Sequence, residues 1–138
     1  MKRFNCIIIL NKDKTKLLFC KRINNPYKGL YNFVGGKIEE NESSIDAAYR
    51  ELEEETGITK LDTELEPFMD FVWHMHDIYM EVYAGILNKD VSLMPEKNPL
   101  QWLGFEENFF DMNAFAGEGN IGHMIEILKM TPKLYKNN

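Results

Sequence analysis

Residues 36–58 read GKIEENESSIDAAYRELEEETGI, and this stretch decides most of what the chain can be. Its run IDAAYRELEEET holds good helix formers and contains neither proline nor glycine. Ser43 in front of the run is a favourable N-cap, and Gly57 behind it can take the left-handed conformation that ends a helix. The stretch therefore predicts a helix over residues 44–56, with one apolar face that packs on a core.

Three carboxylates project from one side of this predicted helix, because Glu51 is followed by Glu54 and Glu55 at spacings of three and four. Like charges at these spacings destabilise a bare helix by roughly a few tenths of a kcal/mol per pair. A divalent cation bound between the carboxylates would turn this repulsion into a favourable interaction. Mg²⁺ and Mn²⁺ prefer such oxygens, whereas zinc is not expected because no Cys/His cluster stands nearby. A solvated acidic face is the ordinary interpretation of such a run alone. The flanking glycines and Glu42 argue against it here.

The spacing of residues across the whole stretch carries a family resemblance. The positions concerned are, in order, Gly36, Glu42, Arg50, Glu51, Leu52, Glu54, Glu55, Gly57 and Ile58. This pattern resembles a complete Nudix box, and its seven fixed identities would coincide by chance about once in 10⁸ placements. The resemblance implies an α/β fold, namely an α/β/α sandwich with a mixed central sheet, as a single domain over residues 1–138.

The resemblance also assigns roles within the box. It implies that Glu51, Glu54 and Glu55 bind the metal and that one of them, or a later loop glutamate, is the general base. The carbonyl of Gly36 is a further ligand candidate, since glycine lets the backbone approach an ion closely. Arg50 is expected to orient Glu51, a role that suits its planar guanidinium, and to pair with Glu42.

The resemblance implies a further loop carboxylate, which is expected to be Glu96, six residues before Trp102. Glu81, Glu106 and Glu107 are weaker choices, and a solvated loop acid is the alternative for Glu96. Four residues outside the acidic set are candidates for substrate binding by similarity to MutT-like members: Arg22 and Lys37 for phosphates, Asn32 and Asn120 for a purine edge. Their alternatives are surface charge for the two cations, a turn for Asn32 and the N-cap of the last helix for Asn120.

The implied activity is Mg²⁺-dependent hydrolysis, with Mn²⁺ as a substitute, of a nucleoside diphosphate linked to another group. The expected substrate is a (d)NTP or an oxidised purine dNTP such as 8-oxo-dGTP, cleaved to the nucleoside monophosphate and pyrophosphate. ADP-ribose, a dinucleoside polyphosphate or a nucleotide sugar is the alternative, although Pro67 comes too early for the proline spacing of ADP-ribose members. A module that senses a nucleotide without cleaving it is disfavoured, because no box acid is missing.

Composition fits one soluble domain, with 138 residues, 44% hydrophobic and 28% charged. The net charge of −6 argues against a nucleic-acid polymer as partner. The sequence contains no run of 18 apolar residues, so it predicts no membrane span. We expect Cys6 and Cys20 to be reduced core thiols of a cytoplasmic protein. The expected partner is a small-molecule nucleotide, and the expected state is a monomer or a homodimer.

The rest of the chain alternates between strand and loop patterns. Strands are predicted over residues 3–10, 16–22, 65–74, 78–88 and 100–104, and a last helix over residues 120–130. Loops 23–31 and 89–119 are expected to set specificity. Six methionines are expected to fill the core: Met75, Met80, Met94, Met112, Met124 and Met130.

Overall fold

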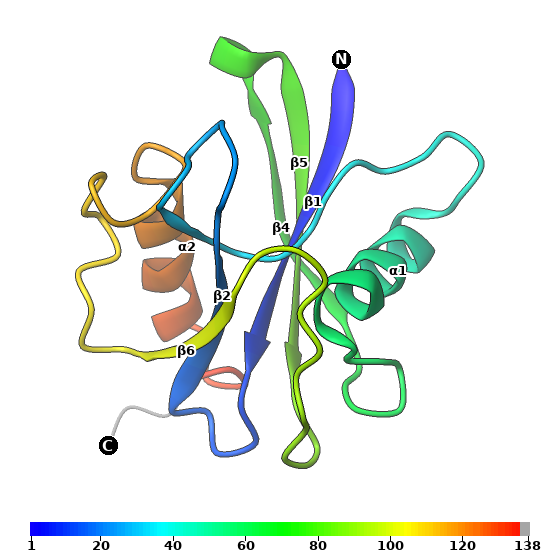
Figure 1. The fold of residues 1–138 in the computed structure, drawn as a ribbon, viewed down its shortest axis with the longest axis vertical. Helices are drawn as coiled ribbons and strands as arrows, with labels where there is room; N and C mark the ends of the chain where they lie inside the picture. The colour runs from blue at the N-terminus through cyan, green and yellow to red at the C-terminus, as the bar shows by residue number, and fades with distance from the viewer. Residues whose placement is uncertain (136–138) are drawn as a thin grey trace.

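The structure is a computed structural model that describes residues 1–135, in which a six-stranded sheet lies between two helices (Figure 1). The elements in chain order are β1 (Lys2–Leu10), β2 (Lys16–Lys21), β3 (Tyr31–Asn32), α1 (Ser44–Thr56), β4 (Glu66–Trp73), the 3-10 turn η1 (His74–His76), β5 (Ile78–Ile86), β6 (Leu100–Gly104) and α2 (Asn120–Lys129). Figure 1 shows α1 and α2 on opposite sides of the sheet. This arrangement confirms the predicted α/β/α sandwich.

The sheet is mixed, as predicted. Its strand order is β3-β2-β1-β5-β4, with β6 paired to β2. β1 runs parallel to β5 in an unbroken register, from Lys2 opposite Ile78 to Leu10 opposite Ile86, while the other pairings are antiparallel. β1 is central, and its apolar run is buried on both faces, as expected for a strand covered by helices on each side.

Two cores form, one on each face of the sheet, because successive side chains of a strand point in opposite directions. Ile7 and Ile9 of β1 pack with Leu52 of α1, whereas Ile8 and Leu10 belong to the core beneath α2. The alternation predicted for residues 78–88 is confirmed in the same way. Met80, Val82, Ala84 and Ile86 join the α2 core, and Tyr83 joins the α1 core.

α1 begins and ends where the sequence predicts. The Ser43 hydroxyl accepts the Asp46 N–H at 3.3 Å and so caps the first turn. Gly57 takes the left-handed conformation with φ of 80°, and its N–H binds the Glu53 carbonyl. Both ends of α1 are therefore fixed by local signals.

The start of α2 differs from the prediction. Gly119, with φ of 92°, is the N-cap, and Asn120 is the first helical residue without a side-chain capping bond. The predicted cap at Asn120 is therefore wrong. The physical reason is the glycine before it, which adopts a backbone conformation that asparagine adopts at greater cost.

Smaller differences concern strand ends and methionines. The predicted strand over residues 65–74 stops at Trp73 because His74–His76 form a 3-10 turn, and β3 was not predicted. Of the methionines expected in the core, Met124 is buried and Met80 half-buried. The expectation is wrong for the exposed ones, which are Met75, Met94, Met112 and Met130. Each of these exposed methionines stands in a turn, in a loop or at a helix end.

Neither helix in the described part of the chain is both long and apolar enough to cross a membrane.

Candidate active site

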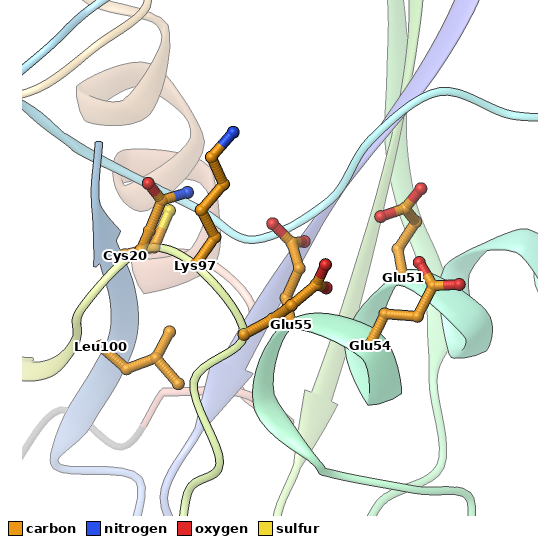
Figure 2. Close-up of a pocket in the computed structure, with 8 residues that line it drawn as sticks. Cys20, Glu51, Glu54, Glu55, Lys97 and Leu100 are labelled. Atoms are coloured by element: carbon orange, nitrogen blue, oxygen red, sulfur yellow. The ribbon is translucent and has the colours of Figure 1, made fainter. Parts of the chain in front are cut away.

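A pocket of about 200 Å³ opens where α1 faces the loop that precedes β6. Glu51, Glu54 and Glu55 of α1 line it, as predicted from their spacing, and Figure 2 shows their side chains projecting from the helix. The opposing loop contributes further polar groups, namely Glu96, Lys97 and Asn98, and the strands contribute Cys20 and Leu100. The structure thus brings the three box carboxylates and the predicted loop carboxylate to one pocket.

Arg50 ties the acidic residues together. Its Nε and Nη2 donate to the two carboxylate oxygens of Glu42 at 2.9 and 2.6 Å, the bidentate geometry that guanidinium favours. Its Nη1 donates to Glu51 at 3.1 Å and to Glu54 at 3.2 Å. Hydrogen bonding from Arg50 lowers the pKa of Glu42 to about 2, so Glu42 stays ionised at neutral pH. The expected pairing of Arg50 with Glu42 is thus present, while its orienting role stays a prediction.

Glu55 is the most desolvated of the acids. Burial raises its pKa to about 7, with a smaller opposing effect from the Gly35 N–H, which donates to Glu55 Oε2 at 2.7 Å. The charges of Glu51 and Glu96 raise it further. Burial also raises the pKa of Glu51, against the lowering effect of Arg50. A bound cation would relieve the cost of ionising Glu51 and Glu55 beside each other.

The donor set fits a hard divalent cation by its chemistry. All the candidate ligand atoms are oxygens, and Glu51 lies so close to Gly36 that a Cβ there would be 2.6 Å from the carboxylate carbon. Within residues 1–135, however, no three His, Cys, Asp or Glu side chains already surround one point as a metal-binding group. Arg50 holds two of the carboxylates, and the Gly36 carbonyl accepts the Asn5 N–H at 2.8 Å, which leaves it one lone pair.

None of the four predicted substrate-binding residues lines this pocket. Arg22 is close enough for its charge to lower the pKa of Glu55, and its Nε binds the Pro26 carbonyl at 2.8 Å. Lys37 is exposed, and its carbonyl accepts from Arg50. Asn32 uses its side-chain oxygen locally, on the Phe33 N–H. Asn32 belongs to strand β3, so the turn-forming alternative is wrong.

The segment that leads into Asn120 lies beside the segment that carries Asn32, a connection that the sequence does not reveal. Residues 114–116 run beside Tyr31, with the Tyr31 N–H bound to the Ala114 carbonyl at 2.8 Å and the Ala116 N–H bound to the Tyr31 carbonyl at 2.9 Å. The Tyr27 hydroxyl also donates to Glu118, at 2.7 Å. The two asparagines are therefore carried by neighbouring segments.

Sequence reasoning missed several groups at the site. Lys97 lines the pocket opposite the acids (Figure 2), and Asn98 accepts the Ile23 N–H at 3.1 Å, which ties loop 23–31 to the pocket wall. Their position directly after Glu96 was the available signal. Asn5 was also missed, although a polar residue at the start of an apolar strand is itself unusual.

Comparison with known proteins places the chain in a family. A sequence model described as the NUDIX domain matches residues 1–121, and the chain therefore belongs to the Nudix family. It is similar to an RNA pyrophosphohydrolase from Saccharophagus degradans, with 43% identity over 63 residues, 46% of this chain and 36% of that protein. An ADP-ribose pyrophosphatase from Methanocaldococcus jannaschii is 46% identical over 50 residues, 36% of this chain and 29% of that protein.

The matched segment thus spans about a third of the length of these two relatives. A structure of MutT, from a study of the Aliivibrio salmonicida and Vibrio cholerae proteins, resembles the fold along nearly its whole length. Its TM-score is 0.71 at 25% identity, and the match covers 94% of this chain and 98% of that one.

Proposed function

We propose that the protein is a divalent-metal-dependent hydrolase that cleaves a nucleoside diphosphate linked to another group. The observation that carries this proposal is the meeting of Glu51, Glu54 and Glu55 with Glu96 at one pocket. In the reaction, a water oxygen bonds to a phosphorus while the bond from that phosphorus to the bridging oxygen breaks. For a nucleoside triphosphate, the products would be the monophosphate and pyrophosphate.

The chain's own groups divide the work. The four glutamates and the Gly36 carbonyl would hold Mg²⁺ or Mn²⁺, which supplies charge neutralisation for phosphoryl transfer. One of these glutamates would take the proton from the attacking water as general base. Arg50 holds Glu51 and Glu54 in place, and Lys97 on the pocket wall would supply a cation for substrate phosphate.

We propose a purine (d)NTP or its oxidised form, such as 8-oxo-dGTP, as the substrate. Asn32 and Asn120 support this choice because each offers both donors and an acceptor to a base edge and they stand on neighbouring segments. Arg22 and Lys37 are the proposed phosphate contacts at the rim. The acidic net charge of −6 favours a small nucleotide over a long polymer.

A substrate panel in Mg²⁺ tests the choice. It would hold the canonical dNTPs, 8-oxo-dGTP, ADP-ribose, a dinucleoside polyphosphate, a nucleotide sugar and an oligoribonucleotide with a 5′-triphosphate. We expect the highest kcat/KM for a purine triphosphate. Faster turnover of ADP-ribose would favour the activity named for the archaeal relative, and faster turnover of the oligoribonucleotide the activity named for the bacterial one. Either result would contradict the proposed substrate. Tight binding without phosphate release from any compound would make the protein a sensor.

Glu54→Gln tests the mechanism separately from the substrate. It removes one carboxylate charge from the pocket and should lower kcat by about 100-fold or more without unfolding the helix. Glu53→Gln is the matched control, because Glu53 stands next to it on α1, is exposed and does not line this pocket. Equal activities of the two variants would remove the proposed mechanism.

A further inference from the structure

Asn5 is a buried polar residue in a strand that is otherwise apolar at this depth. Its side chain is 3% exposed, and it lies two residues before Ile7, on the same face of β1. Ile7 packs in the core beneath α1. The Asn5 amide is therefore directed to the side of the sheet that carries the acidic helix, and no step of the proposed reaction has used it.

Asn5 forms two hydrogen bonds with Gly36. The Asn5 N–H donates to the Gly36 carbonyl at 2.8 Å, and the Gly36 N–H donates to Asn5 Oδ1 at 3.0 Å. The second bond fixes the orientation of the amide, because only its oxygen can accept a hydrogen bond. The residue before Gly36 also lies close to Asn5, since a Cβ on Gly35 would be 2.3 Å from the Asn5 carbonyl oxygen.

The other end of the amide has no acceptor. Asn5 Nδ2 is buried and makes no hydrogen bond in the described part of the chain. A buried donor without a partner costs free energy and calls for a reason. Two carboxylates are candidates for it. Glu51 lies directly on Gly36, the residue that Asn5 holds, and Glu81 stands opposite Asn5 in the register of β1 and β5.

The contacts of Glu81 argue against it. One Glu81 oxygen accepts from Arg3 at 2.8 Å, and the other accepts from the Tyr83 hydroxyl at 3.4 Å. The Glu51 carboxylate accepts a hydrogen bond from Arg50 Nη1 on its Oε1. Its second oxygen has no protein donor among the described residues. Glu51 is therefore the carboxylate with room for another hydrogen bond.

We propose that Asn5 is a positioning residue for the metal site. It holds Gly36 against Glu51 through its backbone and its Oδ1, and its Nδ2 donates to the Glu51 carboxylate when that carboxylate binds a cation. A ligand that is itself hydrogen-bonded keeps its orientation, so loss of such a partner weakens metal binding. The inference rests on the proposed function, because it requires Glu51 to be a ligand.

The test is the dissociation constant for Mn²⁺, measured by calorimetric titration or electron paramagnetic resonance without any substrate. Asn5→Asp keeps the acceptor for the Gly36 N–H and replaces the Nδ2 donor by an oxygen. The added negative charge alone would strengthen cation binding. We expect the opposite, a dissociation constant raised about tenfold, because the donor is lost. An unchanged or lower value in a folded variant would overturn the inference.

Asn5→Ala supplies an uncharged variant and a double-mutant cycle. Its effect on Mn²⁺ affinity should largely disappear in the Glu51→Gln background and persist in the Glu81→Gln background, because only Glu51 is the proposed partner. Additive effects with both glutamines, or wild-type affinity in Asn5→Ala, would contradict the role. If the wild-type protein itself binds no Mn²⁺, the proposed metal site fails together with this inference. Wild-type binding with unchanged affinity in both Asn5 variants overturns the inference alone.

Discussion

Arg50 shows at the residue scale how one side chain organises the acidic site. Its guanidinium reaches Glu42, Glu51, Glu54 and the Lys37 carbonyl, so its fixed fork sets the direction of several oxygens at once. A lysine ammonium keeps the charge but cannot reproduce these directions. The value of Arg50 to the site therefore lies in its geometry more than in its charge.

We predict that Arg50→Lys lowers kcat by about 10- to 100-fold, in the range found when groups that orient metal ligands are lost. The free energy of unfolding should fall by no more than about 1 kcal/mol, because Arg50 is partly exposed. Arg3→Lys is the matched control, since Arg3 also binds a glutamate and a serine but on β1, away from the pocket. The measurements are steady-state kinetics and urea denaturation. Comparable kinetic losses in both variants would refute the geometric role.

The two cysteines give a second prediction at this scale. Both are free and buried, and burial raises the pKa of Cys6 to about 12 and of Cys20 to about 11. We expect neither thiol to react appreciably with a thiol reagent at pH 8 until denaturant is added, because the thiolate is the reactive form. Since the folded pKa lies above the unfolded one, stability present below about pH 8.5 should decline as the pH rises towards 11. Rapid stoichiometric labelling of the native protein would contradict this.

At the scale of elements, the site depends on a loop that runs along β1. The Ile7 N–H binds the Val34 carbonyl at 2.8 Å, and the Ile38 N–H binds the Arg3 carbonyl at 2.9 Å. Between these bonds, Gly35 has φ of 148° and touches the Asn5 backbone. The loop can lie this close to the strand only because a side chain is absent at that point.

Gly35→Ala should therefore lower the free energy of unfolding by about 2 kcal/mol or more, because the methyl group meets backbone that cannot move aside. Gly29→Ala serves as the comparison. Gly29 also has a positive φ, of 84°, but a Cβ there meets nothing within 4 Å. It should cost about 1 kcal/mol. Chemical denaturation of both variants gives the difference, and an equal loss would show that strain, not contact, dominates at Gly35.

Local signals made α1 predictable from the sequence. Its cap, its helix formers and the spacing of Glu51, Glu54 and Glu55 all lie within one short stretch. The loop carboxylate Glu96 lines the pocket, as the family resemblance of its region led us to expect. These are the parts of the site that depend on residues close together in the chain.

The remaining parts depend on contacts between distant segments. The parallel pairing of β1 with β5 and the contact of Asn5 with Gly36 join residues that no periodicity relates. Asn120 was misplaced as a cap because the left-handed conformation of Gly119 could not be distinguished from that of other loop glycines. The exposed methionines were misassigned because composition says nothing about which loops are covered.

At the scale of the whole molecule, the site concentrates negative charge in a protein that already carries a net charge of −6. Glu55 illustrates the cost, because burial raises its pKa to about 7 in the folded state. A raised folded pKa means that stability present below the unfolded value of about 4.3 is lost as the pH rises through about 7. The site is thus arranged for a ligand at the expense of the metal-free fold, as active sites commonly are.

This trade-off predicts a reversal in stability. Without metal at pH 8, Glu55→Gln should be more stable than the wild type by about 1 kcal/mol, and the gain should vanish as the pH falls towards 4.3. In excess Mg²⁺ the order should invert, since the wild type gains about 2.7 kcal/mol at a hundredfold excess over the dissociation constant.

Glu53→Gln, on the exposed face, should stay within about 0.5 kcal/mol of wild type in both conditions. Thermal and urea denaturation with and without Mg²⁺ provide the measurement. An unchanged order of stability on adding Mg²⁺ would mean that Glu55 does not bind the ion.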